Sequence, residues 1–347
     1  MPKEKLYNPS VDILRIISIL AVLFIHTSTR TLEASSFNLD KIPWTIFFNQ
    51  IFRFAVPLFF MISGFVLELN YHLHESYLNY LKKRINRIFI PFVFWSGIYY
   101  FFVYTKHTEN FFVSLVNGDA SYQLYFIPAL LIFYLLFPLI HNFYIYFANK
   151  LIFIIFALLQ LILLYYEYYI QPIPIFYPLR VAFLNYFVFF IGIVASHHIA
   201  QINEFVRKWK IIIFTFTSIL GGYIFLEGKN LYLQTHNYLY LYSQWRPEVL
   251  IYTILLASLL YYIFAKNFIS IKIVKKLASL SFFVFFVHVI VLEITWSFFG
   301  KSFFQLTEVF PLKQLWFDPL FFLIVTFISF LLAYLAHKIP RLSTISG

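Results

Sequence analysis

Three ionisable side chains lie within one apolar stretch near the start of the chain. Asp12, Arg15 and His26 are surrounded there by Ile, Leu, Ala, Val and Phe residues. In an α-helix the eleven residues from Arg15 to His26 make about three full turns, so these two side chains share a face, and Asp12 lies within about 40° of it. Ionisable groups inside a membrane nearly always face the bundle interior or a water-filled cavity. The pattern therefore indicates a functional site, with His26 as a candidate general base.

A second candidate, Arg53, lies in the next apolar segment. Counting about 1.5 Å per residue along both segments places Arg53 and His26 at similar depths in a bilayer core of about 30 Å. A guanidinium beside an imidazole opposes a second positive charge on that ring, which leaves the ring able to accept a proton. The alternative is a structural histidine that holds two helices together by a hydrogen bond. The presence of Asp12, Arg15 and Arg53 favours the functional interpretation.

Arg84 and Arg87 lie three residues apart at the start of the third apolar segment, so they share a helix face at one membrane boundary. Two guanidiniums in this arrangement can bind the phosphates of a ligand. The alternative is the ordinary positive charge of a loop at the membrane surface, and the residues alone do not decide between the two. For the neighbouring Lys82 and Lys83 we accept the ordinary interpretation.

Two more residues are candidates for substrate binding. His288 is an intramembrane histidine in the apolar segment 278–299, where packing is the alternative role. Glu248 begins the segment 248–265, where it either binds a substrate or stabilises the first turn of a helix, and the second role is favoured. Neither cysteines nor histidines at metal-ligand spacing are present, so we expect no metal site and no disulfide.

The composition identifies the elements that must position these groups. The 347 residues are 61% hydrophobic and only 12% charged, with a mean hydropathy of +0.79, whereas a soluble domain carries about 25% charged residues. We therefore predict an all-α fold, a polytopic membrane helix bundle that forms a single domain over residues 1–347. About ten transmembrane helices are expected, at about 11–29, 45–68, 88–105, 122–141, 150–168, 181–200, 210–226, 248–265, 278–299 and 317–337.

The distribution of positive charge orients the chain. With the N-terminus in the cytoplasm, the inner segments hold 16 of the 26 Lys and Arg residues and the outer segments hold 8, while Arg15 and Arg53 lie within spans. This bias fits the positive-inside rule, so both termini are predicted to be cytoplasmic. The net charge of +11 is thereby explained by membrane topology, and no nucleic-acid partner is expected.

Five motifs occur in an order that resembles the acyltransferase-three family of bacterial membrane acyltransferases. The resemblance covers essentially the whole chain and is strongest to the stand-alone members, which have no periplasmic hydrolase domain. The motifs are Asp12-x-x-Arg15 followed by His26, the run from Val56-Pro57 to Ser63-Gly64-Phe65, Arg84-x-x-Arg87-x-x-x-Pro91 with Trp95, Tyr125-Phe126-Ile127-Pro128, and Ser281-x-x-x-Phe285-x-x-His288.

The resemblance implies a fold, an activity and a location in the bacterial cytoplasmic (inner) membrane. It implies transfer of an acyl group, with acyl-CoA (acetyl-CoA) as co-substrate and no bound cofactor, to a hydroxyl of an extracytoplasmic glycan or lipid-linked sugar. The family's essential first-span histidine corresponds to His26, and its Arg-x-x-Arg motif to Arg84 and Arg87. The chain departs from the family pattern at Ile16, where glycine is usual, and at 285–287.

These implications combine with the residue pattern into a set of expected roles. His26, Arg53 and Asp12 are the candidate catalytic residues, with Arg53 stabilising an oxyanion. Arg15 joins the Arg-x-x-Arg pair in binding the acyl-CoA. The main alternative is an exporter or flippase for a polysaccharide or lipid-linked sugar, which would use the same charges as a pathway. A structural subunit of a polysaccharide assembly is a third interpretation.

Overall fold

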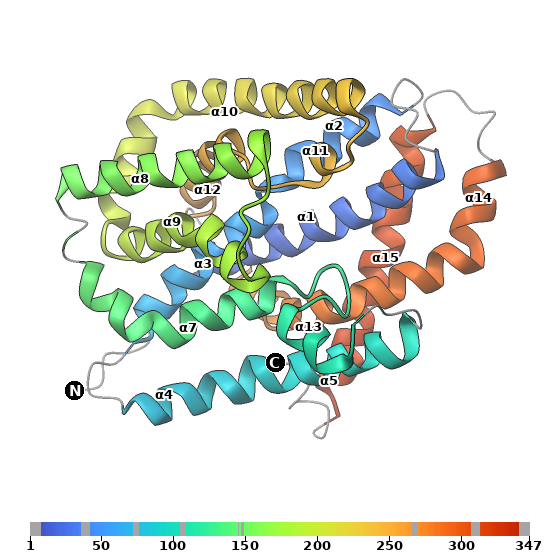
Figure 1. The fold of residues 1–347 in the computed structure, drawn as a ribbon, viewed down its shortest axis with the longest axis horizontal. Helices are drawn as coiled ribbons and strands as arrows, with labels where there is room; N and C mark the ends of the chain where they lie inside the picture. The colour runs from blue at the N-terminus through green and yellow to red at the C-terminus, as the bar shows by residue number, and fades with distance from the viewer. Residues whose placement is uncertain are drawn as a thin grey trace.

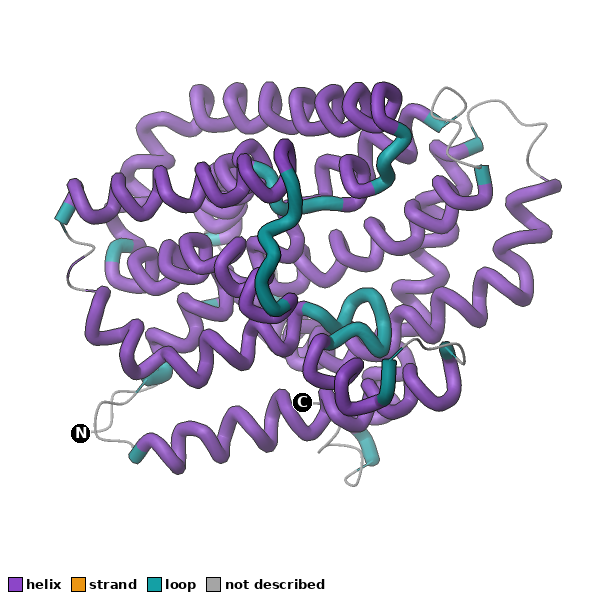
Figure 2. The backbone as a smooth tube through the Cα atoms, in the orientation of Figure 1, coloured by secondary structure: helices purple, strands orange, loops and turns teal. Residues whose placement is uncertain are grey.

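A computed structural model describes residues 8–35, 42–71, 76–104, 109–144, 146, 149–265, 270–306 and 313–339. Within these residues the chain is a bundle of helices joined by short connections, with no strand (Figures 1 and 2). Ten helical stretches in this part of the chain are long and apolar enough to cross a membrane. The predicted all-α, multi-pass architecture is therefore confirmed, while the orientation of the termini stays a prediction.

The ten stretches are built from the following elements. The helices, in chain order, are α1 (Pro9–Ala34), α2 (Pro43–Ile51), η1 (Phe52–Phe54), α3 (Ala55–Leu69), α4 (Tyr77–Arg84), η2 (Ile85–Phe89), α5 (Ile90–Ile98), η3 (Tyr99–Val103), α6 (Phe111–Asn117), α7 (Phe126–Phe143), α8 (Lys150–Tyr165), η5 (Tyr166–Ile170), α9 (Tyr177–His197), α10 (Ile199–Thr235), α11 (Leu239–Tyr242), α12 (Pro247–Phe264), α13 (Ile271–Thr295), η6 (Trp296–Gly300), α14 (Lys301–Leu306) and α15 (Gln314–His337).

Two prolines shape the helices that carry predicted site residues. A proline lacks the amide proton for the carbonyl four residues earlier and its ring clashes with that carbonyl. Pro57 follows the 3₁₀ turn η1, which contains Arg53, and Pro91 follows the π-helical turn η2, which contains Arg87. Each arginine is the residue four positions before its proline. The local change in helix type therefore coincides with a charged side chain that lines one of the cavities described below.

Helix α1 lies in the middle of the bundle, where it packs against α2, α3, α13 and α15 (Figure 1). Helices α3 and α9 approach through glycines: a Cβ on Gly64 would lie 2.1 Å from the Phe189 carbonyl oxygen, and a Cβ on Gly192 would lie 1.9 Å from that of Met61. Only hydrogen fits at these positions, so the two backbones touch.

Helix α10 runs along one edge of the bundle and extends beyond the predicted span 210–226 (Figure 1). Its 37 residues correspond to about 55 Å, which exceeds a hydrocarbon core of about 30 Å. Its first turns carry polar and charged residues that hydropathy alone excludes from a span. The helix therefore continues past the apolar stretch because backbone hydrogen bonding does not require apolar side chains.

Candidate functional site

His26 lines a cavity of about 420 Å³, which we call the His26 cavity. Helix α1 places the half-buried imidazole there, with its ring centroid 4.7 Å from that of Tyr122. The cavity is lined by Val22, Ile25, His26, Thr29, Arg30, Glu33, Arg53, Val56, Phe59, Tyr104, Tyr122, Gln123, Tyr125, Phe126, Tyr242, Gln244 and Phe285. The predicted pair of His26 and Arg53 thus lines one cavity, together with amides, phenols and hydroxyls.

Arg53 is a buried guanidinium that is held only by neutral groups. Its side chain is 5% exposed, one terminal nitrogen donates to the Asn49 side-chain oxygen, and the other donates to the Tyr242 carbonyl oxygen at 2.8 Å. Its Nε has no hydrogen-bond partner, and no carboxylate of the described residues lies within ion-pair distance. A buried positive charge without a counter-ion favours a ligand group that carries or develops negative charge.

Tyr125 adds a phenol to the same cavity. The Gln244 amide nitrogen donates to its oxygen at 2.8 Å. A phenol, whose ordinary pKa is about 10, keeps its proton at neutral pH and can act as a hydrogen-bond donor.

His288 lies against His26 but does not line the cavity. The two imidazole rings are stacked with their centroids 5.3 Å apart, and His288 is fully buried. Its Nδ1 lies 3.1 Å from the Val284 carbonyl oxygen, to which it donates, while its Nε2 has no partner. The structure brings the two predicted histidines together, with His288 behind His26 as seen from the cavity.

A second cavity, of about 450 Å³, contains the other predicted arginines, and we call it the Arg15 cavity. It is lined by Arg15, Phe59, Ile62, Ser63, Val66, Leu67, Asn70, Lys83, Arg84, Arg87, Ile88, Phe126, Leu130, Tyr134, Ala278, Ser279, Ser281, Phe282 and Phe285. The four cations come from α1 and from the α4–η2 segment, and none of the described residues that line this cavity is a carboxylate. Such a surface is suited to a multiply charged anion.

Local contacts hold two of these cations in place. Arg15 Nη1 donates to Asp12 Oδ1 at 2.7 Å, one helical turn away. The Arg84 guanidinium stacks over the Tyr80 ring at 4.7 Å. Asp12 itself lines neither of the two cavities, and its position about 21 Å along α1 from His26 keeps it away from that histidine. The ion pair of Asp12 with Arg15 instead holds the Arg15 side chain in position.

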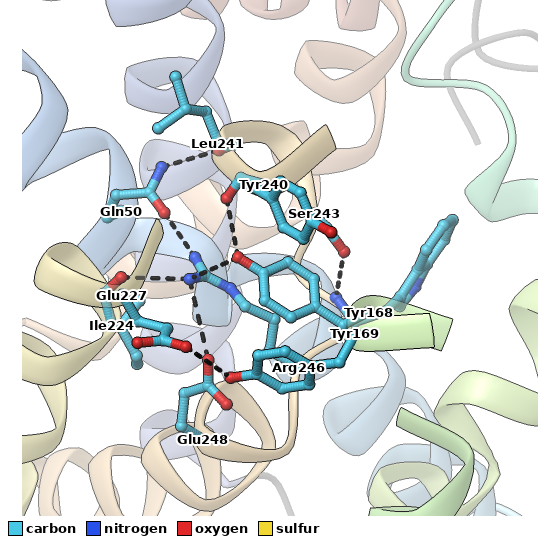
Figure 3. A network of polar contacts seen from close by, with 11 residues as sticks. Gln50, Tyr168, Tyr169, Ile224, Glu227, Tyr240, Leu241, Ser243, Arg246 and Glu248 are labelled. Atoms are coloured by element: carbon cyan, nitrogen blue, oxygen red, sulfur yellow. Dashed lines mark hydrogen bonds and ion pairs between the residues drawn. The ribbon is translucent and has the colours of Figure 1, made fainter. Parts of the chain in front are cut away.

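Glu248 belongs to a buried polar network around Arg246 (Figure 3). Its Oε1 lies 3.8 Å from Arg246 Nη1. Arg246 is fully buried and also donates to Gln50 Oε1 at 2.5 Å and to the Ile224 carbonyl oxygen at 3.1 Å. Glu248 lines neither cavity. The structure therefore does not bring this predicted substrate ligand to the other site residues.

Sequence reasoning missed several polar groups near the two cavities. Arg30 lines the His26 cavity and forms ion pairs with Glu33, at 2.7 Å, and with Glu293 on α13. Outside both cavities, the Glu68 carboxylate is within hydrogen-bond distance of two histidines. Its Oε2 lies 2.9 Å from His141 Nδ1, and its Oε1 lies 2.8 Å from His197 Nε2. Arg30 and Glu33 lie three residues apart on α1. The spacing in the chain carries no signal for the other contacts, because their partners lie on different helices.

The described residues contain no group of three His, Cys, Asp or Glu side chains arranged to hold a metal ion. What they contain is a histidine with a buried guanidinium in one cavity and a cluster of cations in the other, within a ten-span bundle. This fold is that of a polytopic membrane protein, and the two cavities offer a group that can accept a proton and a set of groups that can bind an anion. The chain belongs to the acyltransferase-three family, whose model, described as an acyltransferase domain, matches residues 8–338.

The chain is also similar to curated bacterial proteins. It is 24% identical over 308 residues to a probable poly-beta-1,6-N-acetyl-D-glucosamine export protein of Staphylococcus epidermidis, which covers 84% of this chain and 82% of that protein. It is 27% identical over 104 residues to the succinoglycan biosynthesis protein ExoH of Rhizobium meliloti, covering 29% of this chain and 28% of the relative. No solved structure matches. The protein is thus a membrane acyltransferase related to proteins of polysaccharide biosynthesis and export.

Proposed function

We propose that the protein transfers an acyl group of the acetyl class from acyl-CoA in the cytoplasm to a hydroxyl of an extracytoplasmic polysaccharide or lipid-linked sugar. One observation carries this proposal: a cavity with a histidine and a buried arginine adjoins a second cavity lined by four cations. Arg15 and His26 are separated by about 16 Å along α1. A donor held by its phosphates at one end of this interval can present its thioester at the other.

The Arg15 cavity is the proposed donor site. Coenzyme A carries several phosphate charges, and Arg84 and Arg87 can bind phosphate oxygens through paired N–H groups. Arg15, held by Asp12, supplies a third guanidinium at 2.7 Å from that carboxylate. These residues lie at the membrane boundary that the distribution of Lys and Arg assigns to the cytoplasm, where acyl-CoA is made.

The His26 cavity is the proposed reaction site. His26 takes the proton of the acceptor hydroxyl, and the resulting oxygen attacks the carbonyl carbon of the thioester. Arg53 stabilises the negative charge that develops on the carbonyl oxygen, with Tyr125 as a second donor to the cavity. The C–S bond then breaks, and the proton on His26 passes to the sulfur of the departing CoA. His288 acts as a positioning residue that supports the ring of His26.

The polar lining of the His26 cavity supports a sugar as the acceptor. Amides of Gln123 and Gln244 and the phenols of Tyr104, Tyr122 and Tyr242 line this space. Amide and hydroxyl groups can donate to and accept from sugar hydroxyls, and aromatic rings offer flat apolar faces for a sugar ring. The names of the two relatives, which refer to polysaccharides, support the same acceptor class.

The test is to reconstitute the purified protein in proteoliposomes with acetyl-CoA labelled in its acetyl group. The proposal expects consumption of the thioester and transfer of the label to the glycan. Absence of both acyl-CoA binding and label transfer would overturn it.

An exporter or flippase is the second candidate, because the first relative is named as a probable export protein. That function requires glycan movement across the bilayer without any thioester. The same proteoliposomes distinguish the two, since movement of glycan in the absence of acyl-CoA, with no label transferred, would establish export instead of acyl transfer.

A further inference from the structure

The His26 cavity and the Arg15 cavity share one wall. Within the described part of the chain, the residues that line both are phenylalanines: Phe59, Phe126 and Phe285. They come from three different helices, α3, α7 and α13. We define these three side chains as the phenylalanine wall.

Along the second span, the residues on one side of Phe59 line one cavity and those on the other side line the other. On the second span, Arg53 and Val56 line the His26 cavity, whereas Ile62 and Ser63 line the Arg15 cavity. Phe59 lies between the two groups and lines both. The wall residue of this span therefore marks the depth at which the two spaces meet.

The same change occurs on the other two elements. Next to α7, Tyr125 lines the His26 cavity and Leu130 lines the Arg15 cavity, with Phe126 between them lining both. On α13, Phe282 lines the Arg15 cavity alone, whereas Phe285, one turn further, lines both. Three independent helices thus place a phenylalanine at the same boundary.

The rings of the wall are in contact. The Phe126 centroid lies 6.0 Å from that of Phe59 and 5.9 Å from that of Phe285, with interplanar angles of 54° and 61°. Aromatic rings at such separations form tilted, favourable contacts that leave no room for a chain of atoms between them. Phe285 also lies 6.3 Å from His288, the ring stacked on His26. Phe126 therefore contacts both other rings of the wall, and the wall adjoins the proposed base.

We propose that Phe59, Phe126 and Phe285 form a gate between the donor cavity and the acceptor cavity, which the acyl-carrying arm of the donor must pass by displacing the rings. When no donor is bound, the closed gate separates the two cavities and keeps water on the cation side from the space beside His26. The gate itself follows from the geometry of the two cavities; only the identity of what passes through it rests on the proposed function.

A closed gate makes each cavity accessible from only one face of the membrane, and this can be measured directly. The chain contains no cysteine, so a single introduced cysteine reports its own accessibility. Thr29→Cys lies in the His26 cavity alone, and Ser63→Cys lies in the Arg15 cavity alone. Both replace a small hydroxyl side chain with a thiol of similar size.

The reagent is a small, membrane-impermeant methanethiosulfonate, added to right-side-out and to inside-out vesicles. With the wall intact, we expect Thr29→Cys and Ser63→Cys to react from opposite faces. Adding Phe59→Ala or Phe285→Ala should make Thr29→Cys reactive from the face that labels Ser63→Cys. Phe59 is only half-buried, so its variant is the safer one for folding.

Phe282→Ala is the matched control, because this ring lies one turn before Phe285 and lines only the Arg15 cavity. It should leave the one-sided labelling of Thr29→Cys unchanged. Labelling of Thr29→Cys from both faces with the wall intact, or from one face only in every wall variant that folds, would overturn the gate.

The labelling experiment is independent of catalysis, so the two proposals can fail separately. If the labelling changes as expected and purified protein transfers no label from acetyl-CoA, the gate stands and the proposed function fails. If acetyl-CoA is turned over and the labelling does not depend on the wall, the proposed function stands and the gate fails.

Discussion

The imidazole rings of His26 and His288 lie 5.3 Å apart at an interplanar angle of 30°, and this stacking joins α1 to α13. Seven of the ten candidate membrane spans of the described residues lie between the two histidines in the chain. His288 is fixed by its hydrogen bond to the Val284 carbonyl oxygen. The ring of His26 therefore rests on an immobile neighbour, as a proton-accepting group requires for a constant geometry.

Replacing His26 with alanine should remove acyl transfer while leaving the protein folded. A positioned general base contributes about 10²–10⁴-fold to rate, so turnover of acetyl-CoA should fall by that factor. The measurement is label transfer in proteoliposomes, together with thermal unfolding in detergent. His198→Ala, at an exposed position outside both cavities, is the control. Near-normal turnover in His26→Ala would contradict the role of His26 as base.

Replacing Arg84 or Arg87 with alanine should weaken donor binding. A hydrogen bond to a charged group contributes about 1.5–3 kcal/mol, which corresponds to an increase of about 10–100-fold in the KM for acetyl-CoA. The rate at saturating donor should change little, because neither residue lies in the His26 cavity.

Lys82→Ala provides the comparison for these two variants. Lys82 is adjacent in the chain and exposed, but it does not line the Arg15 cavity. If all three variants raised the KM equally, the effect would be one of surface charge and not of a donor site.

Arg246 and Glu248 should affect stability more than substrate binding. Arg246→Ala removes a fully buried guanidinium and leaves Gln50 and Glu248 without their partner, so the free energy of unfolding should fall by about 3–5 kcal/mol. Thermal unfolding in detergent measures this loss. Arg207→Ala, in an exposed pair with Glu204, should change stability by less than about 0.5 kcal/mol.

The Glu248→Gln variant decides the role of that carboxylate. If Glu248 has a structural role, Glu248→Gln should lower thermal stability and leave the KM for the glycan acceptor unchanged. A higher KM at unchanged stability would instead support direct substrate binding by Glu248.

Gly192→Ala should destabilise the bundle. The added methyl group would lie 1.9 Å from the Met61 carbonyl oxygen, so α3 and α9 must separate to accept it. Overpacking of this kind destabilises by about 1–3 kcal/mol. Gly222→Ala is the matched control, because its added methyl meets nothing within 4 Å and alanine favours helix by about 0.5–1 kcal/mol. Opposite shifts in unfolding temperature are expected, and equal shifts would contradict the close approach.

The ten spans and the pairing of His26 with Arg53 could be predicted from the sequence, for one physical reason. A bilayer of fixed thickness relates residue number to depth, so residues on different spans can be compared without knowing the packing. The same reasoning correctly separated Arg15 from His26 along α1. It predicts depth but not rotation about the helix axis, which is why it could not show that Glu248 faces Arg246 and not a cavity.

The remaining site residues depend on contacts that depth does not specify. Gln244 meets Tyr125 across 119 positions of chain. The three wall residues are members of a set of 48 phenylalanines. The motif that contains Phe285 does not show that its ring lines both cavities, whereas the neighbouring Phe286 packs against Trp95. Only the packing of helices separates the two roles.

The glycine contacts between α3 and α9 have a mechanical consequence. Helices whose backbones touch at two points one turn apart cannot slide or tilt relative to each other without a clash, so they move as one rigid body. Phe59 is carried by that body. The phenylalanine wall can therefore open in two ways: its rings can rotate, or α7 and α13 can move relative to the α3–α9 pair. In both cases the α3–α9 pair stays rigid.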